Sequence, residues 1–136
     1  AHVLDIGTGS GILAITALLL GAKDATGIDI DALAVKVAAE NAAINGVGEH
    51  FTPQRGDLAK DVTGTFNLIT ANIVADIIID LTPDAVKLLS ADGVYIMSGI
   101  IEKRKADVVK VLDSLDLSII EEKSDRGWYA IAVKKK

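Results

Sequence analysis

Near the start of the chain, a short apolar run leads into a turn with three glycines and then into a long apolar segment. The parts are the run Val3–Ile6, the glycines Gly7, Gly9 and Gly11, and the segment Ile12–Leu20. The run is typical of a buried strand, and the segment is apolar on every side, as expected of a helix buried against a sheet. Glycine tolerates positive φ, so it suits a tight connection between the two. The pattern predicts the first strand–turn–helix unit of an α/β fold.

Strand-like and helix-like segments alternate along the rest of the chain. Further strands are predicted over Ala25–Ile30, Phe51–Gln54, Asn67–Ala71, Val94–Ser98, Leu117–Glu121 and Tyr129–Val133. Further helices are predicted over Ala32–Asn45, Ala75–Leu81, Thr82–Leu89 and Glu102–Leu115. Alternation with short connections indicates a parallel sheet covered by helices on both faces. The last two strands have no helix between them, so the last strand is expected to run antiparallel. The predicted class is α/β, with a doubly wound, Rossmann-like, seven-stranded and mostly parallel sheet.

Four local signals refine these boundaries. Asp31 is placed to cap the second helix. Pro53 cannot donate a ladder hydrogen bond, which favours an edge position for its strand. Thr82 and Pro83 fit an N-cap followed by a first-turn proline, and therefore predict that a separate helix begins there. Asp92–Gly93 is typical of a turn.

Composition narrows the functions that such a fold can carry. The chain has 136 residues, half of them hydrophobic, which predicts one domain with a sizeable core. A net charge of −5 disfavours non-specific nucleic-acid binding. With no cysteine and two histidines, neither a thiolate nucleophile nor a metal site is predicted. No apolar run approaches the roughly 20 residues of a membrane helix, so we expect a soluble, cytoplasmic protein. No unusual exposed stripe suggests assembly, so we expect a monomer. Because the chain opens on a strand expected at the centre of its sheet, we interpret it as a fragment of a longer protein.

The glycine turn is expected to hold a ligand, because open α/β sheets bind ligands at the carboxyl ends of their strands. Two ligand classes fit: a dinucleotide, or a nucleoside that carries an amino-acid carboxylate. A dinucleotide fingerprint places Gly or Ala where this chain has Ile12, which opposes that class. Gly7-x-Gly9-x-Gly11 preceded by an acid is instead the pattern of methyltransferases that use S-adenosylmethionine. We therefore predict that this ligand is bound by Asp5, Gly7, Thr8 and Gly9. A turn without a ligand is the alternative.

Two later segments supply candidate groups for the nucleoside. Asp29 ends the second strand, where a carboxylate can accept hydrogen bonds from both ribose hydroxyls, and Ile30 can cover one face of the adenine. Asp57 and Leu58 follow the third strand and are predicted to bind the adenine amino group and ring. The nearby Asp31 is assigned to helix capping, and Asp57 as an ordinary exposed acid is the alternative reading.

Asn72 follows the fourth strand, at the edge where the donor's methyl group is expected. We predict that its side-chain carbonyl helps to bind the donor and orients the lone pair of an amine that accepts the methyl group. In this reading Asn72 is the catalytic residue, and no histidine is placed to act as a base. A turn-forming asparagine is the alternative.

Taken together, these motifs resemble one family, the bacterial methyltransferases that modify protein eleven of the large ribosomal subunit. The matching segments are Asp5–Ile15, Gly27–Asp31, Glu40–Ala42, Asn45–Gly46, Ala71–Ile73 and Ser98–Ile100. The resemblance implies the class I methyltransferase fold and transfer to lysine ε-amines and an N-terminal α-amine of that protein. By position, Gly7, Asp29 and Asn72 match the family's donor-binding residues.

The chain also departs from the family pattern. A threonine upstream of the first strand and an N-terminal substrate-recognition domain have no counterpart in the 136 residues, which are expected to form the catalytic domain alone. Gly127-Trp128 stands where the family usually has Glu-Trp. The loop Asn72–Ala75 lacks the two prolines and the aromatic typical of adenine and glutamine methylation. A small-molecule amine methyltransferase and a donor-binding domain without activity remain the alternatives.

Overall fold

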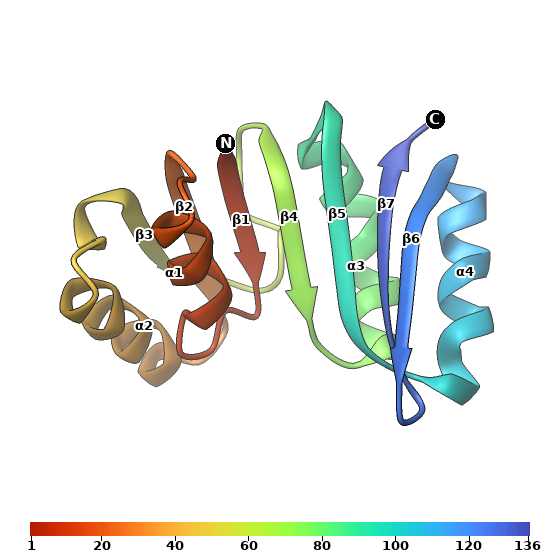
Figure 1. The fold of residues 1–136 in the computed structure, drawn as a ribbon, viewed down its shortest axis with the longest axis horizontal. Coiled ribbons are helices and arrows are strands. Elements are labelled where there is room, and N and C mark those ends of the chain that lie inside the picture. The colour runs from red at the N-terminus through yellow and green to blue at the C-terminus, as the bar shows by residue number, and fades with distance from the viewer.

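The computed structural model describes all 136 residues, and they form one seven-stranded sheet with four α-helices (Figure 1). The strands are β1 (His2–Ile6), β2 (Asp24–Asp29), β3 (Phe51–Arg55), β4 (Phe66–Asn72), β5 (Leu89–Ile101), β6 (Leu117–Asp125) and β7 (Trp128–Lys135). The helices are α1 (Ile12–Leu19), α2 (Ala32–Ile44), α3 (Ala75–Leu88) and α4 (Lys105–Ser114). Short 3₁₀ turns precede β3 and α4.

The strand order is β3-β2-β1-β4-β5-β7-β6. Strands β1 to β5 pair in parallel, whereas β7 lies between β5 and β6 and runs antiparallel to both. The prediction of a seven-stranded, mostly parallel sheet with an antiparallel last strand is thus confirmed. The edge position expected from Pro53 is also confirmed, because β3 is an outer strand.

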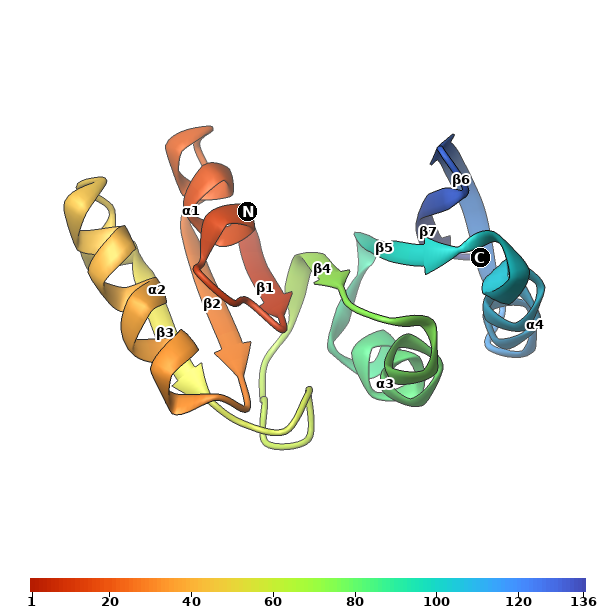
Figure 2. The ribbon, with the colours of Figure 1, turned by 90° about the horizontal axis from the view of Figure 1, so that it is seen from below.

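The helices lie on opposite faces in the two halves of the sheet (Figure 2). Helices α1 and α2 pack on β1, β2 and β3, whereas α3 and α4 pack on β4, β5 and β6 from the other side. The connection therefore changes face between the neighbouring strands β1 and β4, whose carboxyl ends point the same way. Such a switch point opens a crevice at the carboxyl ends of the strands of an α/β sheet, and ligands bind there.

Two apolar clusters hold these layers together. The larger one has 21 buried residues and fills the space beneath α3 and α4, and the smaller one has eight residues beneath α1 and α2. In the smaller cluster the small side chains Ala14, Ala38 and Ala42 bring the two helices close to the sheet. Helix α1 was predicted to be buried against the sheet; it buries one stripe, Ala14, Ile15 and Leu18, and leaves Ile12 66% exposed. A single sheet face can cover only one side of a helix.

The predicted break at Thr82-Pro83 is wrong, since α3 continues through both residues. Thr82 is buried, and its hydroxyl donates to the carbonyl of Ile78 one turn back instead of capping a new helix. The buried face also continues past the proline, from Ile78 to Ala85. Packing of this face offsets the hydrogen bond that the proline cannot donate.

Asp92–Gly93, predicted as a turn, lies inside β5. It occupies an irregularity of the ladder, where Phe66 pairs with Leu89 and Leu68 already pairs with Val94. Strand β5 has more residues than β4 at this point and forms a bulge. The turn-forming residues Asp92 and Gly93 therefore lie within a strand.

None of the four helices combines the length and apolar character needed to cross a membrane.

Candidate functional site

The glycine turn between β1 and α1 adopts a left-handed backbone at each of its three glycines. The φ angles of Gly7, Gly9 and Gly11 are 73°, 56° and 86°, which residues with a side chain rarely adopt. The N–H groups of Gly7 and Thr8 both donate to the carbonyl of Ile28 at 2.8 Å. The turn is therefore fixed to the end of β2.

Asp29, the last residue of β2, joins this turn to the next helix. Its Oδ2 accepts the N–H of Gly9 at 3.0 Å, and its Oδ1 accepts the N–H of Asp31 at 3.0 Å. Each carboxylate oxygen has two lone pairs, so both oxygens can accept one further hydrogen bond. Asp31 caps α2 by accepting the N–H of Leu33, which confirms the role predicted for it.

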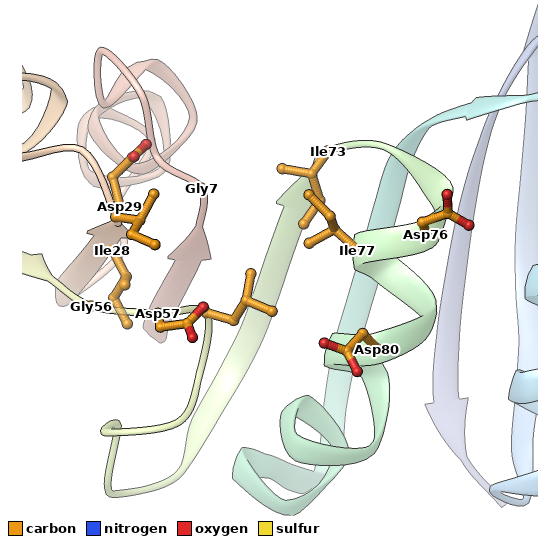
Figure 3. Close-up of a pocket in the computed structure, with 11 residues that line it drawn as sticks. Gly7, Ile28, Asp29, Gly56, Asp57, Ile73, Asp76, Ile77 and Asp80 are labelled. Atoms are coloured by element: carbon orange, nitrogen blue, oxygen red, sulfur yellow. The ribbon is translucent and has the colours of Figure 1, made fainter.

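A pocket of about 580 Å³ opens between these segments and α3 (Figure 3). Its volume lies within the range of small-molecule sites. In the close-up, Asp29, Ile28 and Asp57 lie on one side, and Ile73 and Ile77 point toward them from the other. The pocket is lined by Gly7, Ile28, Asp29, Ile30, Gly56, Asp57, Leu58, Ile73, Asp76, Ile77 and Asp80. It therefore lies at the switch point between β1 and β4.

The structure brings five of the predicted ligand-binding residues together around this pocket: Gly7, Asp29, Ile30, Asp57 and Leu58. Four others do not line it: Asp5, Thr8, Gly9 and Asn72. Gly9 nevertheless contacts the pocket wall through its hydrogen bond to Asp29.

Asp5 lies behind the turn, where it is only 2% exposed. Its carboxylate accepts hydrogen bonds from the hydroxyls of Thr8 at 2.9 Å and Thr70 at 2.7 Å. Burial raises the pKa of Asp5, and the two hydroxyls oppose that rise. Both Asp5 and Thr8 are buried and do not line the pocket, and their contact with the ligand stays a prediction. Their hydrogen bonds brace the turn against β4, because a buried acid needs partners inside the protein.

Asn72 ends β4, with its side chain exposed, and pairs with Ser98 of β5 in the ladder. The next residue, Ile73, lines the pocket. Gly99 approaches the same loop so closely that a Cβ at Gly99 would lie 3.0 Å from Asn72 Oδ1 and 3.0 Å from the carbonyl oxygen of Ile73. Asn72 therefore stands at the rim of the pocket, on a loop that is held by backbone from β5.

Sequence reasoning missed the wall formed by α3 and by Ile73 in the loop before it. Within the helix, Ile77 and Asp80 lie three positions apart on one face, a spacing that was visible in the sequence. Which face of that helix meets the glycine turn depends on strand order, and the sequence pattern did not specify that order.

Carboxylates dominate the charge of the pocket: Asp29, Asp57, Asp76 and Asp80. Asp57 pairs with Lys60 at 3.2 Å, and this hydrogen bond raises the pKa of the lysine. Asp76 pairs with Arg104 at 2.6 Å, and the hydrogen bond from the guanidinium lowers the pKa of that acid. An acidic wall favours a cationic ligand and disfavours the pyrophosphate of a dinucleotide.

The residues present fit S-adenosylmethionine, a sulfonium with a net positive charge. A Cβ at Gly7 would come within 2.8 Å of Ile73 Cγ2, so the turn passes the pocket wall with room for backbone alone. Asp29 keeps acceptor capacity for hydroxyl groups, and Ile30 and Leu58 offer apolar surface to a flat ring.

Comparison with known proteins supports the same reading. The family described as ribosomal protein L11 methyltransferase (PrmA) matches residues 1–136. Curated relatives with the name ribosomal protein L11 methyltransferase include those of Desulfitobacterium hafniense, 42% identical over 133 residues, and Caldicellulosiruptor bescii, 46% identical over 133 residues. Each match covers 98% of this chain but only 42% and 43% of the respective relative. The chain thus spans less than half the length of these curated relatives.

Solved structures agree on the fold. The crystal structure of ribosomal protein L11 methylase from Lactobacillus delbrueckii subsp. bulgaricus superposes with a TM-score of 0.96 at 39% identity, covering 99% of this chain and 70% of that one. The tRNA methyltransferase TrmK of B. subtilis superposes with a TM-score of 0.86 at 18% identity. The match covers all of this chain and 60% of the TrmK chain. At that identity the likeness shows the fold alone. With a family match over its whole length, the chain belongs to the ribosomal protein L11 methyltransferase (PrmA) family.

Proposed function

We propose that this chain is the catalytic domain of an enzyme that transfers methyl groups from S-adenosylmethionine to amines of ribosomal protein L11. The observation that carries the proposal is the acid-lined pocket at the switch point, where Gly7 and Asp29 meet. The names of the relatives supply the substrate class. We assign the proposed reaction to the cytoplasm, because its substrate is a ribosomal protein. Because the relatives are more than twice as long, docking of the L11 protein as a whole is assigned to residues outside this chain.

In the proposed site each residue has a distinct part in binding the donor. Asp29 accepts hydrogen bonds from the sugar hydroxyls, and Asp57 accepts one from the adenine amino group. Ile30 and Leu58 pack against the adenine ring, and Gly7 allows the ligand to approach the backbone. Asp5 and Thr8 contribute indirectly by holding the turn in place. When bound, S-adenosylmethionine supplies an electrophilic methyl group on its sulfonium.

The acceptor must be a neutral amine with its lone pair directed at that methyl group. A free lysine amine has a pKa of about 10.4, so it must lose a proton to water before it can attack. We assign Asn72 Oδ1 to accept a hydrogen bond from the amine N–H, which orients the lone pair. Alignment of this kind is worth several kcal/mol in oriented intramolecular reactions. If Asn72→Ala left turnover of L11 unchanged, this role would be wrong.

Titration calorimetry of this chain with S-adenosylmethionine tests donor binding. We expect Asp29→Asn to weaken the affinity about tenfold or more, because a charged acceptor is lost. Asp31→Asn is the matched control, since it removes the same charge two residues away, retains a helix cap and does not line the pocket. Absence of binding by the unmodified chain, or preferential binding of a dinucleotide, would overturn the proposal.

The acceptor is tested separately with the full-length protein and isotopically labelled donor. Mass spectrometry is expected to show label on amines of ribosomal protein L11. Label found only on small molecules would support the alternative of a small-molecule amine methyltransferase and contradict this substrate.

A further inference from the structure

A second cavity, of about 210 Å³, lies on the other side of the loop that follows Asn72. Val74 and Trp128 form apolar walls, Gly99 forms part of the floor, and Asp76 and Arg104 supply the charges. Both apolar side chains are largely exposed, and Trp128 is 54% exposed. An exposed tryptophan face beside an acid is a suitable surface for an alkyl chain that ends in a cation.

Asp76 borders both cavities. It stands in the first turn of α3, and its side chain is 77% exposed. In Figure 3 its carboxylate points away from Asp29 and Asp57, whereas Ile73 and Ile77 point toward them. The acid therefore contributes to the rim of the donor pocket while its charge faces the second cavity.

Arg104 is the present partner of Asp76, and it has a second partner. Its Nη2 lies 2.6 Å from Asp76 Oδ1, and its Nε donates to Asp107 Oδ2 at 3.0 Å. Because Asp107 would continue to bind the guanidinium, Arg104 can give up Asp76 without becoming unpaired. The ion pair is exposed on the Asp76 side, so exchanging one cation for another there costs little.

We propose that Asp76 selects a cationic acceptor: an alkylammonium group lies between Val74 and Trp128 and replaces Arg104 as the partner of Asp76. This inference rests on the proposed function, because it assigns the second cavity to the amine that is methylated. Recognition uses the protonated amine, and the proton then passes to water at this open rim before the amine reaches Asn72. Asp76 is thus a specificity-determining residue, and Arg104 is a competitor that the substrate displaces.

The test uses the only tryptophan of the chain, Trp128, as a fluorescent reporter. The probes are n-butylammonium and the neutral butan-1-ol, titrated into this chain. We expect saturable binding of the ammonium, about fivefold tighter than that of the alcohol, as an exposed ion pair can provide. Asp76→Asn is expected to abolish that preference. Asp92→Asn is the matched control, because it removes the same charge at an exposed position that neither pairs with Arg104 nor lines the cavity.

Arg104→Gln separates competition from a structural role. If Arg104 competes for Asp76, its removal tightens ammonium binding several-fold. If the ion pair only shapes the cavity, removal weakens binding, and the proposal is overturned. It is also overturned by a preference for ammonium that survives Asp76→Asn, or by the absence of saturable binding. Calorimetry with S-adenosylmethionine on the same variants shows whether the donor pocket is intact, so a failure of the proposed function is read separately.

Discussion

Gly9 donates its backbone N–H to Oδ2 of Asp29 at 3.0 Å, which joins the turn after β1 to the acid that ends β2. The residues lie twenty positions apart, and the bond forms because β1 and β2 are neighbouring parallel strands. The turn and the acid therefore form one unit before any ligand binds. A pre-arranged site of this kind does not lose the conformational entropy of ordering the loop on binding.

Replacing Gly7 with alanine is expected to destabilise the turn in two ways. The backbone has a φ of 73°, and a Cβ would come within 2.8 Å of Ile73 Cγ2. The left-handed backbone alone costs about 1–2 kcal/mol for a residue with a side chain. We expect Gly7→Ala to lower the free energy of unfolding by more than this amount, as measured by urea denaturation.

Gly9→Ala is the control for that substitution. Gly9 has a φ of 56°, and a Cβ there would meet nothing within 4 Å. It should therefore show the backbone cost without the collision. Combining Gly7→Ala with Ile73→Ala removes the colliding methyl group, so the effects of the two changes should be less than additive. Equal losses for Gly7→Ala and Gly9→Ala would contradict the close approach.

Asp5→Asn is expected to change how stability depends on pH. Burial raises the pKa of Asp5 above 3.8, so the folded state retains the proton at a pH where the unfolded chain has lost it. The stability contributed by this group is present below 3.8 and is lost as the pH rises toward the higher folded pKa. Asparagine does not ionise, so the free energy of unfolding of the variant, minus that of the parent, should rise as the pH rises through this window.

Urea denaturation at several pH values measures that difference. Asp92→Asn removes one negative charge at an exposed position and serves as the control. If the free energy of unfolding of Asp5→Asn, minus that of the parent, stayed constant or fell as the pH rises through this window, Asp5 would not be held in a proton-retaining environment.

Short-range patterns in the sequence were enough to predict most of the helices and strands. Alternating apolar runs located all seven strands, and the side chains of Asp31 and Pro53 marked a helix start and an edge strand correctly. The break predicted at Thr82-Pro83 failed because the buried face of α3 outweighs the local preference of proline. Burial of that face depends on the sheet beneath it, which a local pattern does not describe.

The residues of the candidate site also fall into those that local sequence patterns predicted and those that they missed. Gly7, Asp29 and Asp57 lie at the carboxyl ends of their strands or within two residues of them, so the carboxyl-end rule placed them at the pocket. Asp5 was predicted to contact the ligand because it precedes the glycines; it is buried and accepts a hydrogen bond from Thr70 of β4, and its contact with the ligand stays a prediction. Ile77 and Asp80 were missed because they reach the pocket from a helix on the other face of the sheet. Both outcomes depend on strand order, which requires long-range contacts.

Thr82 and Tyr95 form a buried polar pair whose members are expected to differ in their response to removal. The hydroxyls lie 3.1 Å apart, and Thr82 also donates to the carbonyl of Ile78. Thr82→Val leaves the buried Tyr95 hydroxyl without a partner, at a cost of about 1–3 kcal/mol. Tyr95→Phe should cost less, since Thr82 retains its backbone partner. In a double-mutant cycle, the two changes together should cost less than the sum of the single changes.

The same pair predicts a loss of stability in alkali. Burial raises the pKa of Tyr95 from 10.0 to about 12. Between these values the unfolded chain has lost the phenolic proton while the folded chain keeps it, so stability falls as the pH rises above 10.0. Tyr95→Phe should lack this part of the decline in denaturation measured between neutral and alkaline pH. An identical decline in the variant would contradict the assignment.

Gly99→Ala is expected to impair turnover more than donor binding. Gly99 has a φ of 83°, and a Cβ there would press on Asn72 Oδ1 and on the carbonyl oxygen of Ile73, each at 3.0 Å. Displacing the side chain proposed to orient the amine should lower kcat about tenfold or more, because alignment is sensitive to small shifts. The matched control is Gly46→Ala, which has a φ of 74° and no atom within 4 Å of the added Cβ. Methylation of ribosomal protein L11 by the full-length protein measures kcat, and calorimetry with S-adenosylmethionine measures donor affinity. Because Asp29 lines the donor pocket and Asn72 does not, a donor affinity that fell as far as kcat would show that Gly99 supports the donor pocket instead of the acceptor loop.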